Sequence, residues 1–219
     1  MSRLFSTLDH IVIVAATLEQ GVDYCEQILG VRPQKGGEHV RTGTHNCLLN
    51  LGDHMYLEVI AINPAVSTCM YPRWFGLDQP VQRERAANSP FLATFVASTN
   101  DICQATKMLP NLGPVRNMQR NNLTWEITIR DDGGLVEGGS VPTVIQWPPA
   151  IHPTQAMPDL GCRLQLLEVY HPQPRELEAI WKRIGLASGA LLQVKQAEHS
   201  QLPHLIAHIL TSVGVRTIS

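Results

Sequence analysis

The sequence predicts an α+β fold made of repeated β-α-β-β-β modules. Two observations support this: alternating apolar runs are followed by capped, amphipathic helical stripes, and the same order of elements returns further along the chain. Thr99 stands 82 positions after Thr17 in a second copy, and Gln165 stands 155 positions after His10 in a looser third copy. We expect a single domain over residues 1–219, with modules at about 7–62, 90–148 and 162–219.

The first module opens with a strand over His10–Val14 and a helix that begins after Thr17. The strand alternates around a β-branched run, as strands do. Thr17 can cap the helix, and Gln20 three residues later completes a possible capping box. Gly30 ends the helix, and its apolar stripe consists of Leu18, Val22, Cys25, Ile28 and Leu29. After a polar, glycine-rich crossing, "HNCLLNL" and "MYLEVIAI" predict two strands joined by a short turn at Asp53.

The second module repeats this order. Pro90–Thr99 reads as a strand, and a short helical stripe of Ile102, Ala105, Met108 and Leu109 is closed by Pro110 and Gly113. The runs "LTWEITI" and "TVIQW" then predict strands on either side of the turn-rich "RDDGG".

The third module is more diverged. "CRLQLLEVYHP" predicts a strand, and Pro172 and Pro174 open a helix that ends at Gly185. "ALLQVKQ" predicts a strand, and the last residues predict a hairpin that turns at Val213-Gly214. Linkers are expected at residues 63–89 and 148–160, which are rich in proline or polar residues.

Composition excludes several classes of function. Lys and Arg number 17 and Asp and Glu 19, so the net charge is −2, and the absence of a basic run argues against nucleic acid as a partner. No apolar run approaches the roughly 18 residues of a membrane span. The first residues lack a signal-peptide core, so a cytoplasmic location is expected. Five cysteines without a CxxC pair are expected to be reduced thiols.

The run "LDHIVIVAATLEQGVDYCEQILGV" resembles the opening of the vicinal oxygen chelate superfamily, which includes glyoxalases, extradiol dioxygenases and thiol transferases. The following "GGEHVRTGTHNCLLNLGDHMYLEVIAINP" is similar, more narrowly, to the glyoxalase-like domain family. This resemblance implies that the modules form a cupped, partly closed mixed β-sheet with the helices outside. It also implies a cavity in the cup that holds a small-molecule substrate and a metal ion.

By the same resemblance, His10 and Glu58 take the positions of two metal ligands, and they are also the candidate catalytic residues. Strand periodicity is compatible with this, because Ile11 and Leu57 then face the helix while His10 and Glu58 face the cup. An imidazole nitrogen and a carboxylate oxygen suit a divalent metal (Zn, Ni, Mn or Fe). The alternatives are a histidine hydrogen-bonded to Asp9 or to a backbone carbonyl, and a glutamate in a salt bridge at the sheet edge.

The partner modules lack the expected further ligands. The shift of 82 puts Leu92 at the histidine position of the second module, and Gln146 lies near the glutamate position. In the third module Gln165 takes the histidine position, with Thr217 or Arg216 near the other end. Two protein ligands leave too much of the coordination shell to water for tight binding.

Other residues are candidates for ligand binding in the same cup. His39 and His45 flank "VRTGT", where Thr44 follows a tight bend and Asn46 can both donate and accept hydrogen bonds. Gln146 and Trp125 are the candidates from the second module, where Glu126 and Trp147 can also line the cup, and Trp74 and Phe75 in the segment 63–89 are expected to form a lid over it. The alternatives for these residues are surface loops and plain core.

The leading interpretation is a glyoxalase-like enzyme, of lyase, isomerase or transferase type, that acts on an oxygenated small molecule. A metal at His10 and Glu58 would polarise its oxygens; without a metal, Glu58 would be the base. The alternative is a non-catalytic protein that binds or sequesters a small molecule in the same cavity. Monomer and homodimer are both compatible with the sequence.

Overall fold

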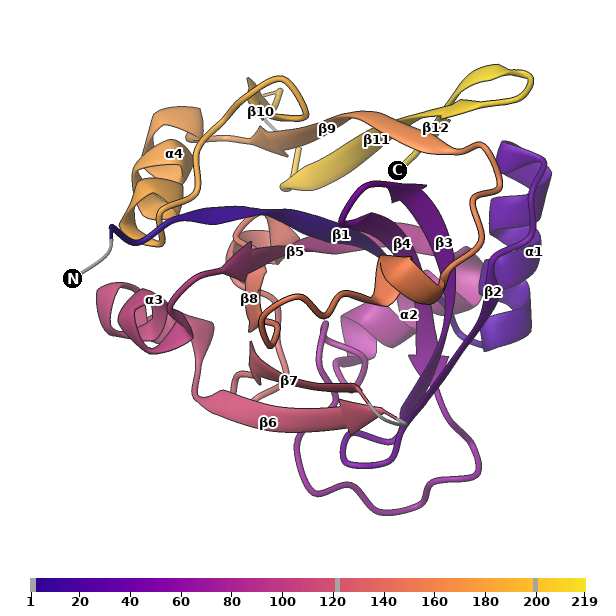
Figure 1. Cartoon of the computed structure of the whole chain (residues 1–219), viewed down its shortest axis with the longest axis horizontal. Coiled ribbons are helices and arrows are strands. Elements are labelled where there is room, and N and C mark those ends of the chain that lie inside the picture. The colour runs from indigo at the N-terminus through magenta and orange to yellow at the C-terminus, as the bar shows by residue number, and fades with distance from the viewer. Residues whose placement is uncertain (1–2, 121–122, 199–200) are drawn as a thin grey trace.

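The chain folds into two mixed β-sheets with helices on the outside (Figure 1). The computed structural model describes residues 3–120, 123–198 and 201–219. The strands of the larger sheet are β1 (Ser6–Val14), β2 (Gln34–His39), β3 (Thr44–Gly52), β4 (Met55–Ile62), β5 (Phe91–Thr99), β6 (Val115–Arg120), β7 (Leu123–Thr128) and β8 (Thr143–Gln146). Those of the smaller sheet are β9 (Arg163–His171), β10 (Leu192–Gln196), β11 (His204–Thr211) and β12 (Gly214–Ile218). The α-helices are α1 (Leu18–Leu29), α2 (Pro80–Asn88), α3 (Ile102–Met108) and α4 (Pro174–Arg183).

Helix α1 forms as its sequence predicts. The Thr17 hydroxyl accepts a hydrogen bond from the Gln20 amide at 3.2 Å, which satisfies one of the unpaired donors of the first turn. Gly30 ends the helix in the left-handed conformation, at φ 73°. Its apolar stripe, which includes Cys25 and Leu29, is buried against the larger sheet.

The larger sheet joins the first two modules through its central strands. Its order is β2-β3-β4-β1-β5-β8-β7-β6, in which β1 is parallel to β4 and antiparallel to β5. The predicted alternation along β1 is confirmed, because Ile11 and Ile13 pack on the side of α1 while Val12 and Val14 pack inside the cup. The α+β prediction and the predicted cup are therefore confirmed.

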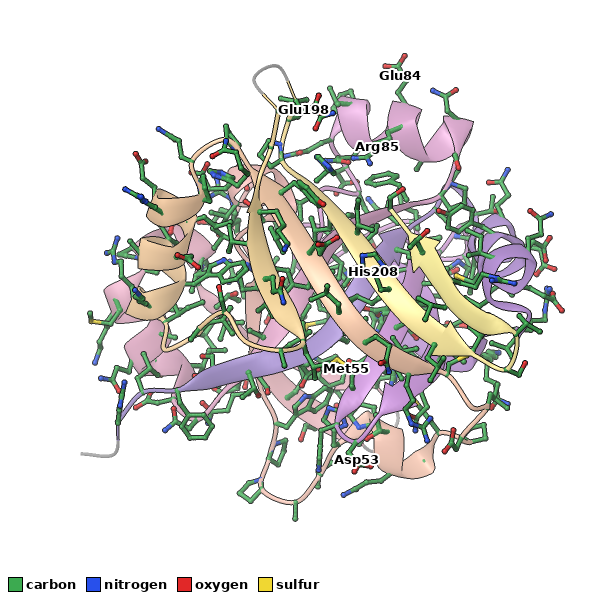
Figure 2. All side chains as sticks on the ribbon, turned by 90° about the horizontal axis from the view of Figure 1, so that it is seen from above. Asp53, Met55, Glu84, Arg85, Glu198 and His208 are labelled. Atoms are coloured by element: carbon green, nitrogen blue, oxygen red, sulfur yellow. The ribbon has the colours of Figure 1, made fainter. Side chains whose placement is uncertain are left out.

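The third module covers the outside of the cup. In the first two modules the first strand pairs with the last one, β1 with β4 and β5 with β8. In the third module the first strand, β9, lies between β10 and β11 and does not pair with the last strand, β12. One face of this sheet packs on the larger sheet, and the other, with His208, faces solvent (Figure 2). Trp181 of α4 is completely buried between the two sheets, and its Nε1 donates to the carbonyl of Ser140 at 3.0 Å.

The structure corrects the repeat register. Strands β1 and β5 start at residues 6 and 91, and Asp101, not Thr99, caps the second helix by accepting a hydrogen bond from the Gln104 amide at 2.8 Å. Leu92 accordingly does not lie at the counterpart of His10: it pairs with Ile13 in the ladder and packs in the core outside the cup.

Segment 63–89, expected as a linker, fills the cup and contains α2. Trp74, Phe75 and Leu77 are buried in the same core as Val12 and Val14. Phe75 has a left-handed φ of 57°, and the amide of the following Gly76 donates to the carbonyl of Gly133 at 2.8 Å. This turn holds the two aromatic rings inside the cup.

None of the helices in the described part of the chain is long and apolar enough to cross a membrane.

Candidate functional site

A β-bulge in β1 places two adjacent polar side chains together inside the cup. In the β1–β5 ladder Leu8 pairs with Ala97 and His10 with Val96, so Asp9 is an extra residue without a partner. Neighbouring side chains normally point to opposite faces of a strand, and a bulge removes that restriction. Asp9 and His10 are both buried, with Asp9 Oδ1 2.6 Å from His10 Nδ1.

The other side of the His10 ring faces Glu58 of β4. His10 Nε2 lies 3.5 Å from Glu58 Oε2, and the ring stacks on Tyr56 with centroids 4.3 Å apart. Asn46 Nδ2 donates to Glu58 Oε1 at 2.5 Å. Asn46 Oδ1 accepts from Arg120 of β6 at 3.2 Å, which connects both walls of the cup.

The His10 imidazole thus lies between the carboxylates of Asp9 and Glu58. The positive charge of a protonated His10 and the negative charges of the two carboxylates stabilise one another. Burial alone would lower the pKa of His10, but the hydrogen bonds to Asp9 and Glu58 outweigh it and raise that pKa above its usual value. Burial raises the pKa of Asp9, yet hydrogen bonds from His10 and His152 bring it down to about 2. Burial likewise opposes the ionisation of Glu58, and the contacts with His10 outweigh it and lower its pKa. Both carboxylates are therefore ionised at neutral pH.

His39 is the neutral histidine of the site. Burial lowers its pKa to about 4. Its Nδ1 lies 3.1 Å from the Thr44 hydroxyl, and its ring meets Trp74 edge-on with centroids 4.9 Å apart. Because the ring is fixed in this way, His39 forms part of the wall as an uncharged group.

We expect His39→Gln to change how stability depends on pH. The unfolded chain binds a proton at residue 39 near pH 6.5, whereas the folded chain binds it only near pH 4. Lowering the pH from 7 to 5 therefore favours the unfolded state by about 2 kcal/mol through this residue. Urea unfolding of both proteins at the two pH values measures this. The stability difference between wild type and variant shrinks by that amount at pH 5; an equal difference at both pH values contradicts the assignment.

The space left in the cup is small. A cavity of about 20 Å³ is lined by His10, His39, Tyr56, Glu58, Arg120 and Trp125, with Trp74, Phe75 and Trp147 among its other walls. This volume accommodates about one water molecule. A substrate larger than a water molecule enters this cavity only if some of the wall residues move.

Five of the predicted site residues come together around this cavity: His10, Glu58, His39, Asn46 and Trp125. Thr44 is buried behind His39 and positions it. His45, next to Asn46, points to the opposite face of β3 and lines a different pocket. Gln146 is also absent from the cavity wall, since its Oε1 accepts from the Ile102 amide at the start of α3, at 2.7 Å.

Other residues complete the site, and two of them, Arg120 and His152, were not predicted. His152 Nε2 lies 3.3 Å from Asp9 Oδ2, and Trp147 Nε1 donates to the same oxygen at 3.0 Å. Arg120, Trp74 and Phe75 complete the wall. The Trp-Phe pair within the polar segment 63–89 was the signal by which Trp74 and Phe75 were expected to cover the cavity; no pattern marked Arg120 or His152.

The donor set does not fit a metal ion held by the protein alone. His10 Nε2 and Glu58 Oε2 meet as predicted, but among the described residues no group of three or more His, Cys, Asp or Glu side chains is placed to bind a metal. The amide of Asn46 contacts Glu58 through Nδ2, and its Oδ1 already accepts from Arg120, whose positive charge disfavours a second cation.

Comparisons with known proteins agree with this architecture. A sequence model of a family described as "Glyoxalase-like domain" matches residues 8–185. No curated protein matches the chain. A crystal structure of a hypothetical protein from Staphylococcus aureus is 14% identical with a TM-score of 0.60, and the match covers 91% of this chain and 88% of that one. This likeness shows the fold alone.

Two enzymes are among the more distant structural matches. Methylmalonyl-CoA epimerase from Mycobacterium tuberculosis is 16% identical, with a TM-score of 0.40, and the match covers 68% of this chain and 90% of that one. A mutant of 4-hydroxymandelate synthase from Streptomyces coelicolor is 11% identical, with a TM-score of 0.49, over 97% of this chain and 61% of that one.

Proposed function

The chain belongs to the glyoxalase-like domain family of the vicinal oxygen chelate superfamily, and from this premise we propose that it is an enzyme of the lyase or isomerase type. Its substrate would be a small molecule with a carbonyl and a neighbouring oxygen, bound in the cup. The observation that carries the proposal is the buried pair of His10 and Glu58, with a 3.5 Å separation between Nε2 and Oε2 at the cavity wall. Burying such a pair is expensive for a protein that only needs a stable core.

In the proposed reaction Glu58 would act as the base and His10 would stabilise the negative charge that forms on the substrate. Glu58 is ionised, so its carboxylate can take a proton from the carbon beside the substrate carbonyl. The electrons of that C–H bond move onto the carbonyl oxygen, where the His10 imidazolium stabilises the negative charge. Asp9 acts as a positioning residue, because its contact with Nδ1 at 2.6 Å fixes the ring. His10 then protonates this oxygen to give an enediol and takes the proton of the neighbouring hydroxyl, and Glu58 delivers its proton to the former carbonyl carbon, which completes an isomerisation.

The substrate would take the place of the aromatic plug formed by Trp74 and Phe75. Trp74 Nε1 is buried and has no hydrogen-bond partner within the described structure. An unsatisfied buried donor costs about 1–3 kcal/mol. This cost favours a rearrangement in which the indole finds an acceptor in the substrate or in solvent.

The divalent metal implied by the family resemblance has no part in this mechanism, because the donor set does not fit it. We expect catalysis to persist in the presence of EDTA. The measurement is the exchange of substrate C–H protons for deuterium in D2O, followed by NMR over a panel of 2-hydroxy and 2-oxo carbonyl compounds and acyl thioesters. Exchange of at least one compound supports the enzyme; loss of exchange on chelation overturns the metal-free assignment.

The alternative is a non-catalytic protein that binds a small molecule. The small volume of the cavity, about 20 Å³, favours it, because a binding protein does not need the rapid substrate access that catalytic turnover requires. A compound that binds in the cup without exchanging its protons would support this alternative. We also propose a cytosolic location, supported by the five cysteines, which are all free thiols.

A further inference from the structure

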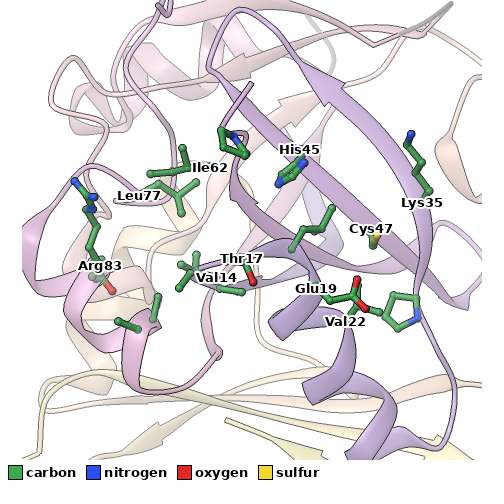
Figure 3. Close-up of a pocket in the computed structure, with 18 of the residues that line it drawn as sticks. Val14, Thr17, Glu19, Val22, Lys35, His45, Cys47, Ile62, Leu77 and Arg83 are labelled. Atoms are coloured by element: carbon green, nitrogen blue, oxygen red, sulfur yellow. The ribbon is translucent and has the colours of Figure 1, made fainter. Parts of the chain in front are cut away.

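A second hollow, separate from the cavity at His10, is a groove next to the cup, and Val14 and Leu77 of the core inside the cup line part of it. Its volume is about 870 Å³, within the range of small-molecule sites. It lies between the start of α1, strands β2 and β3, and helix α2 (Figure 3). No residue of the groove lines the cavity at His10 and Glu58.

The floor of the groove is apolar. It includes the side chains of Val14, Val22, Cys47, Ile62, Leu77 and Ala86. Exposing a continuous apolar hollow of this kind to water is unfavourable, and an apolar occupant would relieve it. The occupant therefore carries a hydrocarbon chain or ring.

The charged residues at the rim of the groove indicate which charge the polar end of the ligand carries. Arg32 already pairs with three carboxylates, those of Glu19, Asp23 and Glu26, and this cluster carries a net negative charge. Lys35 and Arg83, by contrast, form no ion pair within the described residues, and they lie on opposite sides of the groove (Figure 3). Two uncompensated cations above an apolar floor complement a ligand with one anionic group.

We propose that this groove is a second small-molecule site, which binds an amphipathic carboxylate. The apolar part lies on the floor between α1 and α2, and the carboxylate faces Arg83 or Lys35 at the rim. His45, which was expected in the cup, lines this groove instead, and burial lowers its pKa, so it adds a polar but uncharged group.

Calorimetric titration with decanoate, below the concentration at which it forms micelles, tests the site, and 1-decanol serves as the uncharged ligand. We expect one decanoate per chain and at least fivefold weaker binding of 1-decanol. Arg83→Gln should weaken decanoate about two- to fivefold, the range of an exposed ion pair, and leave 1-decanol unchanged. Lys182→Gln on α4, which removes the same charge far from the groove, is the matched control. Equal effects of the two variants overturn the role of Arg83.

A blocking variant tests the location. Ala87 is exposed on α2 and lines the groove, so Ala87→Trp should fill the space without disturbing the core and weaken both ligands more than tenfold. Unchanged decanoate binding in this variant places the ligand elsewhere and overturns the proposal. Sedimentation of the wild type shows whether the groove is instead covered by a second copy: a dimer abolished by Ala87→Trp also overturns it.

Cys47 provides a local readout. Its thiol lines the groove, whereas Cys103 is exposed on α3. Bound decanoate should slow the alkylation of Cys47 by N-ethylmaleimide, measured by mass spectrometry, and leave Cys103 unaffected. Equal rates with and without decanoate contradict binding at this site.

Discussion

We expect replacement of Glu58 by glutamine to lower the rate of substrate proton exchange by about 10²- to 10⁴-fold, the usual contribution of a general base. Glutamine has almost the same shape, and its Oε1 can still accept from Asn46 Nδ2, so the wall of the cavity is kept. What is lost is the ability to hold a proton. The rate constant for exchange in D2O, measured by NMR at saturating substrate, reports this loss directly.

The matched control for this experiment lies on the outer sheet. Glu168 is also a carboxylate beside a histidine, with Oε2 2.9 Å from His208 Nε2, but it faces away from the cup. Glu168→Gln should exchange at the wild-type rate. If Glu58→Gln retains that rate as well, Glu58 is not the base, and the pair with His10 serves only the fold.

We expect replacement of Asp9 by asparagine to destabilise the protein by about 3 kcal/mol, since it removes one partner of a buried ion pair. Asp9 is almost completely buried and contacts His10, His152 and Trp147. Its folded pKa of about 2 lies below the unfolded value, so its contribution is full above pH 4 and is lost as the pH falls through 2. Urea unfolding at pH 7 therefore measures the whole effect.

Asp53→Asn is the control for this prediction. Asp53 lies in the exposed turn between β3 and β4 (Figure 2), where the same substitution should change stability by less than about 0.5 kcal/mol. The pKa of His10, followed by NMR, should also fall in Asp9→Asn, because the contact with Asp9 raises it. Equal stability of the two variants, or an unchanged His10, would show that the Asp9–His10 contact does not matter.

The sequence was sufficient for those parts of the fold in which local chemistry and burial agree. Thr17 and Gly30 delimit α1 because a hydroxyl cap and a left-handed glycine act locally. His10 and Glu58 could be placed on one face because buried strands keep a period of two. The missed strands β2 and β6 are polar and lie at the two edges of the sheet, so no apolar alternation marks them.

Much of the candidate site could not be predicted because it depends on contacts between distant segments. Asp9 joins His10 only through the bulge, which is defined by the pairing with β5 and not by β1 itself. His45 and Asn46 are adjacent in sequence but serve opposite faces of β3, and only the position of α1 decides which face is inside. Arg120 reaches Asn46 across the cup, from a strand that is distant in the chain.

The bulge at Asp9 also divides β1 into two segments that pair with β5 in different registers. In a regular ladder, the gain or loss of one residue reverses the faces of every following side chain. Because the extra residue of β1 is already accommodated at Asp9, the pairing of Ser6–Leu8 with β5 is independent of the pairing that starts at His10. A shift of register before Asp9 therefore need not reverse the face of β1 on which His10 lies.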